Sequence, residues 1–485
     1  MSVFARARSL GVAWDYVCAP TGQVKANCWA LAEAAGHACW HRMQALLRTY
    51  RWDHLAVRDL LAPLAGRWLT CPAGDPVGPG IAIDETASLK KGDRTCAVAP
   101  QHVGCTGKVE NCVTSVFAAY VTPAGACWVD FDVYLPDRWA TDPAHRARAG
   151  VPDDVAFTTE PDLAAAQIRR LAATGLPFAW VAGDEVYGRS SRLRAVCTEL
   201  GLTGVFIVPA TFTITTPAGT TTTAAQAAAD AVFERRPCGR GTKGPRLFDW
   251  ALIATDDPCQ VLLVRRLITR PDQLAYFTCH VPDPTMIRLP FLATIAGRRW
   301  PVEETFKIGK DVFGWDQPQV RTYTGVHRHT VLTALAVLRQ VAARARLDTP
   351  GQPRPPASQQ IEAPHPSPIP ADPSTPAGLR IPLGDSPVPT HPAQSRPADL
   401  GCIHLSVAEH RRLLALAHAK AAGLLTPTAE AFHLAWSRRR RRHQATARWH
   451  HHRRHLRQAL DPRRPSLPVT QPPSEPPTGS HTTIT

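Results

Sequence analysis

The sequence predicts an α/β protein whose central part alternates strands and helices. Short apolar runs bounded by proline, glycine and charged residues predict strands at 80–83, 113–120, 126–134 and 178–182. Amphipathic segments predict helices at 160–174 and 190–200. Strands followed by alternating helix and strand indicate a mixed sheet covered by helices.

The chain divides by composition into four predicted regions. Residues 1–75 contain amphipathic helical segments and are predicted to form a small helical domain. Residues 76–345 form a catalytic domain, for which the strand and helix order favours a ribonuclease-H-like fold. A β-rich insertion is expected at about 203–285, with strands at 247–254, 259–266 and 274–278. Residues 346–400 are proline-rich and predict a disordered linker, and 401–485 predict a short helix and an Arg/His-rich basic tail.

Charge favours a polyanionic partner. The 485-residue chain has a formal net charge of +15 and a pI near 9.5. The run from Arg438 to Arg464 predicts phosphate binding without sequence preference. Thirteen cysteines form no C-x-x-C pair, and there is no long uncharged apolar run. We therefore expect a reduced cytoplasm and no membrane partner.

Two aspartates each follow an apolar run. Asp84 follows Gly80-Ile81-Ala82-Ile83, and Asp184 follows a second run that ends in Gly183. Both carboxylates are therefore expected at the exits of buried strands. Divalent cations prefer such oxygen ligands, and pairs of these ions commonly catalyse phosphodiester cleavage.

A third segment carries Arg299, Glu303 and Lys310, spaced by four and seven residues. This spacing predicts that all three share one face of a helix. A metal-binding carboxylate beside two phosphate-binding cations suits phosphoryl transfer. Each candidate carboxylate belongs to an acidic doublet, and one doublet alone is more often a solvated turn. The three segments together favour a metal-dependent nuclease.

At these residues the chain resembles the DDE transposases of bacterial insertion sequences, in the group with the signature Y-x-x-R-x-x-x-E-x-x-x-x-x-x-K. Arg299, Glu303 and Lys310 fit the spacing, whereas Ala296 occupies the tyrosine position. Further similar segments extend the resemblance over about 25–345: Asp84-Glu85-Thr86, Leu89-Lys90-Lys91-Gly92, Gly107-Lys108-Val109-Glu110-Asn111, Asp184 to Gly188 and Gly325-Val326-His327-Arg328-His329.

The resemblance implies a cut-and-paste transposase that cleaves element ends and joins them to target DNA. Asp84, Asp184 and Glu303 would be catalytic and would hold two Mg²⁺ ions, with Mn²⁺ able to substitute. Double-stranded DNA would be the partner, contacted by Arg299, Lys310, Lys90, Lys91 and Lys108. The helical domain at 1–75 would be a candidate for binding DNA ends. It also implies a homodimer that pairs two ends, in the nucleoid of a bacterial cytoplasm.

Two alternatives stay open. One is a catalytically silent relative that binds element ends as a regulator, a role that the missing tyrosine would fit and three intact carboxylates disfavour. The other is a ribonuclease-H-fold nuclease without strand transfer. The terminal repeat, the target preference and the use of hairpinned ends depend on flanking DNA.

Overall fold

The structure is a computed structural model, and it describes residues 3–22, 27–104, 106–241, 244–348, 390–391, 393–421, 423 and 425–460. Most of the predicted linker at 346–400 and the tail beyond 460 lie outside the described residues. In the part of the chain that is described, no helix combines the length and apolarity needed to cross a bilayer.

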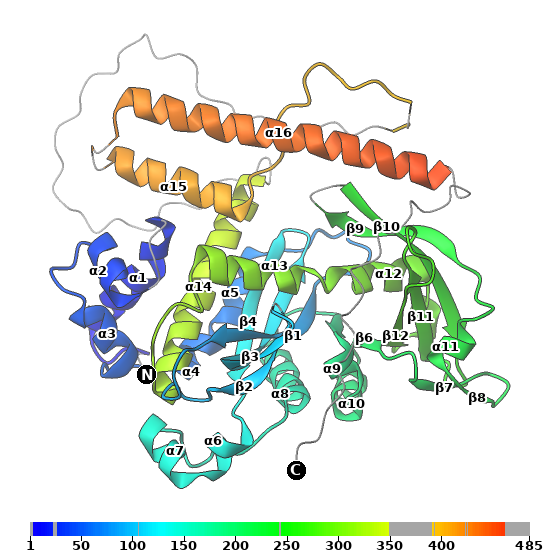
Figure 1. The fold of residues 1–485 in the computed structure, drawn as a ribbon, viewed down its shortest axis with the longest axis horizontal. Coiled ribbons are helices and arrows are strands. Elements are labelled where there is room, and N and C mark those ends of the chain that lie inside the picture. Colours follow the sequence, from blue (N-terminus) through cyan, green and yellow to red (C-terminus); the bar gives the residue numbers. More distant parts are fainter. Residues whose placement is uncertain are drawn as a thin grey trace, which may run out of the picture.

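A ten-stranded mixed sheet forms the centre of the molecule (Figure 1). Its order is β2-β3-β1-β5-β6-β12-β11-β10-β9, and β4 pairs with β3 off this path. The strands are β1 Gly80–Leu89, β2 Ala99–Val103, β3 Lys108–Thr122, β4 Gly125–Val133, β5 Trp180–Gly183, β6 Thr203–Val208, β9 Glu234–Gly241, β10 Gly244–Ala254, β11 Gln260–Arg266 and β12 Leu274–His280. A separate two-stranded sheet joins β7 Thr213–Thr215 to β8 Thr221–Thr223.

Helices lie on both faces of this sheet and at its ends. The helices before the sheet are α1 Ala7–Cys18, η1 Ala19–Gly22, α2 Cys28–Ala34, α3 His41–Arg48, α4 His54–Asp59 and α5 Leu61–Trp68. Those that follow are α6 Asp137–Thr141, α7 Pro143–Ala149, α8 Glu160–Ala173, α9 Glu185–Gly188, α10 Ser191–Glu199, α11 Ala224–Ala227, η2 Pro284–Met286, α12 Leu289–Arg298, α13 Pro301–Lys307, η3 Ile308–Val312, α14 Tyr323–Asp348, α15 Val407–Ala421 and α16 Pro427–Leu460.

Most predicted elements form close to their expected bounds. The strands expected at 113–120, 126–134 and 178–182 and the helices expected at 160–174 and 190–200 are all present. The three strands expected between 247 and 278 form β10, β11 and β12, and they extend the same sheet through β6. The sheet therefore continues without interruption from the central strands into the expected β-rich segment.

The end of β1 was predicted wrongly. The sequence suggested an exit at Ile83, but β1 continues to Leu89 because β3 pairs with it along its whole length, up to the pair Leu89 and Cys112. On its other side, β1 pairs with β5 in parallel only from Gly80 to Ala82. Beyond Ala82, β5 no longer pairs with β1, and Asp84 lies in this part of β1.

The two faces of the sheet are covered by different helices. On β4, Asp130 pairs with Arg170 of α8, with Nε and Oδ2 2.9 Å apart. The next residue, Phe131, points to the opposite face, where its ring contacts Phe117 at a centroid distance of 5.9 Å. Phe117 in turn meets Phe306 of α13, at 5.6 Å. Helix α8 therefore covers one face of the central strands, and α13 covers the other.

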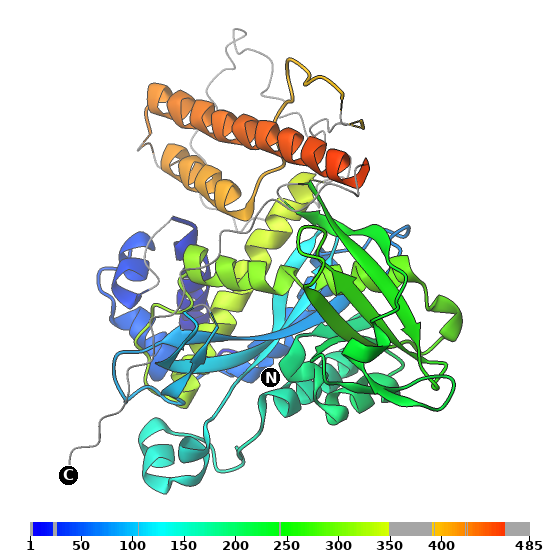
Figure 2. The same cartoon turned by 45° about the vertical axis from the view of Figure 1, so that its right-hand side comes forward.

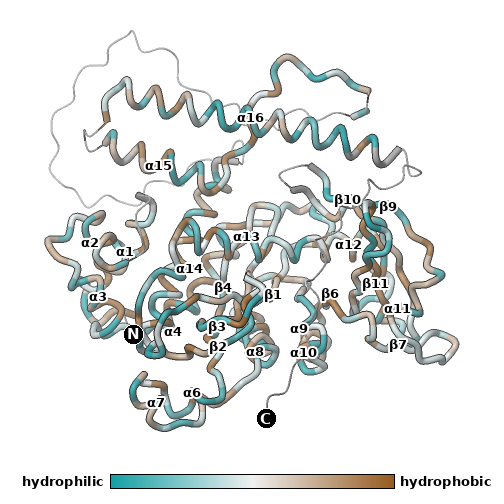
Figure 3. The backbone as a smooth tube through the Cα atoms, in the orientation of Figure 1, coloured by the Kyte–Doolittle hydropathy of each residue, from teal (hydrophilic) through white to brown (hydrophobic). Residues whose placement is uncertain are grey.

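The N-terminal helices pack against α14, which also contacts β4. Leu46 and Leu47 of α3 are fully buried and belong to the same continuous hydrophobic core as the central strands. Figure 3 shows hydrophobic segments in these helices as well as along the sheet. The expected helical segment is present, and the domain boundary at residue 75 stays a prediction.

Replacing Gly309 with alanine should destabilise the fold. A Cβ atom at Gly309 would lie 2.0 Å from Cη2 of Trp128. The Trp128 ring cannot easily move, because Nε1 donates to Thr305 Oγ1 at 2.8 Å and the ring is buried. We expect Gly309→Ala to lower the free energy of unfolding by roughly 1–3 kcal/mol. The midpoint of urea denaturation measures this change.

Gly11→Ala is the matched control. Gly11 lies in α1 and a Cβ atom there would meet nothing within 4 Å. This substitution should be neutral or stabilise by roughly 0.5–1 kcal/mol, because alanine is the better helix former. Equal midpoints for the two variants would contradict the packing argument.

Candidate active site

Asp84 and Asp184 come together because β1 and β5 are parallel neighbours. Strand β5 ends at Gly183, and Asp184 caps α9, its carboxylate accepting a hydrogen bond from the Val186 N–H at 2.9 Å. Asp84 is two residues beyond Ala82, the last β1 residue paired with β5. Parallel strands present their carboxyl ends at the same edge, so these two carboxylates meet there.

A third carboxylate joins them from the neighbouring position on β1. Oxygen atoms of Asp84, Glu85 and Asp184 all lie within 4.8 Å of one another. Consecutive strand residues point to opposite faces, so Asp84 lies on the α13 face and Glu85 on the α8 face. They converge on Asp184 because β5 has ended, and no backbone separates the two faces at that point.

The sequence suggested that Arg299, Glu303 and Lys310 lie on one continuous helix. The structure instead divides this signature segment into separate helical pieces. Helix α12 ends at Arg298, α13 starts at Pro301, and a π-helical turn spans Ile308–Val312. Proline interrupts helical hydrogen bonding, which accounts for the break. Arg299, at the junction, still reaches Asp84, with Nη1 and Oδ2 2.9 Å apart, and lies 3.9 Å from Glu303 Oε1. The segment therefore brings Arg299 to Asp84 and places Glu303 next to Arg299. Among the described residues, Glu303 is not in the group of carboxylates whose oxygens all lie within 4.8 Å of one another.

Burial and mutual repulsion raise the pKa values of Asp84 and Glu85. Burial raises the pKa of Asp84 well above its usual value; Arg299 lowers it, and Glu85, Asp184 and Glu303 raise it further. Burial and the charge of Asp184 also raise the pKa of Glu85, although a hydrogen bond from Tyr187 acts to lower it. The Tyr187 hydroxyl donates to Glu85 Oε2 at 2.7 Å, which fixes that carboxylate.

Glu160, at the start of α8, is a fourth acidic group beside the cluster on the α8 face. Burial, together with the charges of Glu85 and Asp184, raises its pKa to about 7. Its charge therefore depends on pH in the neutral range. The cluster concentrates negative charge. Among the described residues, Arg299 is the only cation shown to form an ion pair with it directly.

The donor set fits a hard divalent cation. Carboxylate oxygens are the preferred ligands of Mg²⁺, and opposite ligands of one Mg²⁺ ion lie about 4.2 Å apart. Three carboxylate oxygens within 4.8 Å match that span. A cation would also relieve the repulsion that raises the pKa values of Asp84 and Glu85.

Comparison with known proteins places the chain in a family. Residues 14–261, about half of the chain, match the family model described as DDE superfamily endonuclease. The chain belongs to the DDE superfamily endonucleases. The match contains Asp84, Glu85 and Asp184 and ends before Glu303. Endonucleases of this superfamily generally use divalent metal ions, in agreement with the donor set of the cluster.

Individual relatives of this DDE superfamily endonuclease are distant. A probable transposase for insertion sequence element IS701 from Microchaete diplosiphon is 32% identical over 157 residues. The aligned part spans 32% of this chain and 37% of that protein. A cryo-EM structure of a piggyBac transposase synaptic complex with hairpin DNA aligns with 11% identity and a TM-score of 0.35, covering 70% of this chain and 66% of that chain. A score at this level does not establish a shared fold.

The basic residues predicted to contact DNA occupy different environments in this endonuclease. Lys310 Nζ donates to the Ala87 carbonyl at 2.8 Å, and Lys90 Nζ donates to the Pro318 carbonyl at 3.2 Å. Burial lowers the pKa of Lys90. Lys91 and Lys108 are exposed. Lys108 is the first residue of β3, where it pairs with Val103. Phe117, which pairs with Asp84, is nine residues further along β3, about 30 Å away.

Three residues of the site region were missed as site members by the sequence reasoning. Glu85 was noticed only as half of an acidic doublet, and strand alternation alone would direct it away from Asp84. Tyr187 lies in the segment after Asp184, and its hydroxyl has no local signature. Glu160 is 76 positions away from Asp84 in sequence and carries no motif. Only the three-dimensional packing of α8 and α9 on β1 identifies these residues.

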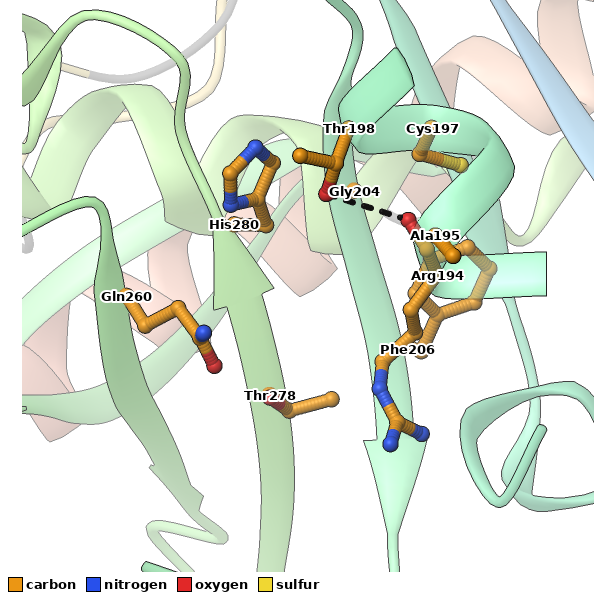
Figure 4. Close-up of a pocket in the computed structure, with 9 residues that line it drawn as sticks. All are labelled: Arg194, Ala195, Cys197, Thr198, Gly204, Phe206, Gln260, Thr278 and His280. Carbon is orange, nitrogen blue, oxygen red and sulfur yellow. Dashed lines mark hydrogen bonds between the residues drawn. The ribbon is translucent and has the colours of Figure 1, made fainter. Parts of the chain in front are cut away.

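A pocket of about 200 Å³ lies elsewhere, between α10 and strands β6, β11 and β12 (Figure 4). Its described lining is Arg194, Ala195, Cys197, Thr198, Gly204, Phe206, Gln260, Thr278 and His280. This lining contains no carboxylate, and none of the clustered acidic residues belongs to it. The pocket is therefore separate from the candidate active site.

Glu160→Gln should stabilise the protein at high pH. A glutamate with a pKa raised from 4.5 to about 7 holds its proton in the folded state after the unfolded state has lost it. The contribution of Glu160 to the free energy of unfolding is therefore fully present below pH 4.5, and it is lost as the side chain ionises in the folded state when pH rises through about 7. The variant should therefore match wild type near pH 4 and exceed it by roughly 1–2 kcal/mol at pH 8, after discounting for solvent screening.

Urea denaturation at several pH values in EDTA measures this difference. Glu33→Gln, at an exposed position in α2, is the control and should show no growing difference with pH. Saturating Mg²⁺ should reduce the advantage of Glu160→Gln, because a bound cation lowers the cost of ionising Glu160. A constant offset across the whole pH range would refute the assignment of Glu160 to this cluster.

Proposed function

We propose that the chain is the DNA transposase of an insertion sequence, with a ribonuclease-H-like catalytic core and a β-rich insertion. The observation that carries the proposal is the convergence of Asp84, Glu85 and Asp184 where β5 ends, in a member of the DDE superfamily endonucleases. The central order β4-β3-β1-β5-β6, with β1, β5 and β6 parallel, supports the proposed core. The similarity to a probable insertion-sequence transposase supports DNA as the substrate.

Asp84, Asp184 and Glu303 are the proposed ligands of Mg²⁺, with Mn²⁺ able to replace it. When bound, the metal ions activate the attacking hydroxyl and stabilise the leaving oxygen of the phosphodiester. Glu303 is 43% exposed at its side chain, and its charge already raises the pKa of Asp84. Glu85 is the competing candidate, because its oxygens are in the cluster while Tyr187 holds it.

The remaining residues position the DNA. Arg299 pairs with Asp84 and stands 3.9 Å from Glu303, so its guanidinium is placed to hold a phosphate beside the cleaved bond. Lys310 holds the signature segment against β1 by donating to the Ala87 carbonyl. Lys90 donates to the carbonyl of Pro318, in the chain that follows this segment. Lys91 and Lys108, at the exposed end of the β1–β3 pair, are proposed to contact DNA further from the cut. A homodimer that pairs two element ends completes the proposal.

The decisive measurement uses a labelled DNA fragment that spans the inverted repeats flanking the gene. Wild-type protein should cut at the repeat boundary with Mg²⁺ and not with EDTA, and Asp184→Ala should abolish cutting. A pre-cut end should be joined to target DNA. Cutting without joining would favour a nuclease of the same fold. Equal DNA binding by both proteins without any cutting would favour a silent regulator.

Glutamine substitutions identify the third metal ligand. Glu303→Gln should lower the cleavage rate by about 100-fold or more, because the loss of one charged ligand weakens metal binding and charge stabilisation. Glu85→Gln should have a smaller effect, since one Glu85 oxygen already accepts a hydrogen bond from the Tyr187 hydroxyl. Glu304→Gln, at an exposed neighbour, is the control and should cut at the wild-type rate. The reverse order for positions 85 and 303 would assign the role to Glu85.

A further inference from the structure

Helix α16 carries the densest positive charge of the described residues. Residues 431–460 contain nine arginines and six histidines and no aspartate or glutamate. Figures 1 and 2 show α16 running across one side of the molecule, from beside α15 towards β9 and β10. Figure 3 shows long hydrophilic stretches along it. The helix also contacts β10.

One face of α16 is fixed to the rest of the protein. Ser437, Arg441, Ala445 and Trp449 recur every four residues and are buried. Arg441 Nε donates to the Ile403 carbonyl at 2.7 Å, and Ala445 and Trp449 share a small core with Leu400. This inner face accounts for the orientation of the helix.

Glu409 of α15 holds the two C-terminal helices together. It accepts hydrogen bonds from Arg440 at 2.7 Å and from Arg412 at 2.9 Å. Burial acts to raise the pKa of Glu409, but these hydrogen bonds and one from Ser437 lower it to about 2. Helix α15 is itself docked, because His410 Nδ1 lies 3.0 Å from Gln340 Nε2 of α14. Arg440 and Arg441 therefore have structural roles.

The opposite face of α16 is exposed on both sides of Thr446 and Ala447, which are half-buried. We define the outer stripe as the residues that recur there at helical spacing and are all exposed: Phe432, Trp436, Arg439, His443, His450, Arg454 and Arg457. The stripe spans 25 residues, which corresponds to about 38 Å along the helix axis. It therefore presents a straight row of cationic and aromatic side chains to solvent.

The arginines of the outer stripe are available for a partner. Within the described residues, Arg439, Arg454 and Arg457 form no ion pair with a carboxylate, in contrast to Arg440. The guanidinium of Arg439 lies over the Trp436 ring, 5.3 Å from its centroid, which supports the side chain without neutralising it. The cations of the active site are already engaged: Arg299 with Asp84, and Lys310 with Ala87.

We propose that the outer stripe of α16 binds the phosphate backbone of duplex DNA over about one helical turn, outside the carboxylate cluster. One turn of B-DNA rises about 34–36 Å, close to the length of the stripe. Guanidinium groups match phosphate oxygens, and the absence of acidic residues from 431 to 460 leaves no repulsion along the row. A membrane-surface helix would need a broad apolar face, whereas the stripe's exposed apolar residues are confined to Phe432 and Trp436 at one end.

This inference rests on the proposed function only for the choice of DNA as the polyanion. Its test needs no catalysis. The affinity of the full-length protein for a labelled 30-base-pair duplex without the terminal repeat is measured in EDTA by fluorescence anisotropy, over a series of KCl concentrations. The test variant replaces Arg439, Arg454 and Arg457 with glutamine. The control variant replaces three exposed arginines elsewhere and has the same net charge: Arg169 of α8, Arg192 of α10, and Arg270 between β11 and β12. Arg169 and Arg192 are surface ion-pair partners of Glu199 and Asp162.

The stripe variant should bind at least about tenfold more weakly at 100 mM KCl. Its slope of log affinity against log salt should fall by up to about 2.7, because three arginines would no longer neutralise DNA phosphates. The control should stay within about twofold of wild type. Equal weakening of both variants would overturn the proposal, because net charge alone would then explain binding. Loss of binding to anionic phospholipid vesicles, with duplex binding unchanged, would overturn it in favour of a membrane surface.

Discussion

Repulsion among carboxylates is the constraint on which the active-site region depends. Asp84, Glu85 and Asp184 are held within 4.8 Å by three separate backbone features: the parallel pairing of β1 with β5, the end of β5 at Gly183, and the continued pairing of β1 with β3. The fold has to offset this repulsion, and it does so from both faces of the sheet. Arg299 pairs with Asp84 on the α13 face, and the Tyr187 hydroxyl hydrogen-bonds to Glu85 on the α8 face.

The same constraint explains how the positive charge is distributed. Cations close to the cluster form specific contacts: Arg298 bonds to Asp75, Arg299 to Asp84 and Lys310 to the Ala87 carbonyl. Such contacts fix the α12–α13 junction and η3 against β1. The arginines of the outer stripe, which form no ion pair within the described residues, are on α16, whose inner face is anchored through Glu409 and Arg441. Cations that shape the site and cations that face solvent therefore belong to different elements.

The sequence predicted the fold better than the site. Buried strands such as β4 and amphipathic helices such as α8 are recognisable from hydrophobic runs and periodicity, and their bounds were close. The end of β1 was wrong because a charged pair after an apolar run normally ends a strand, and only pairing with β3 reveals that it continues. Glu85 could not be expected beside Asp84, since alternation directs consecutive residues to opposite faces. Their convergence depends on where a different strand, β5, ends.

Charge balance links the cluster to a phosphodiester substrate. If Asp84, Glu85, Asp184 and Glu303 are all ionised, Arg299 leaves three negative charges uncompensated, which agrees with the raised pKa values of Asp84 and Glu85. One divalent cation would leave a single negative charge, and the site would still repel a phosphate. Two divalent cations would leave one positive charge, which the single negative charge of a phosphodiester balances. A two-ion site is therefore the arrangement in which this set of side chains, with Glu303 as a proposed ligand, would attract the proposed DNA substrate, and the same ions would free Arg299 from Asp84 to contact the phosphate.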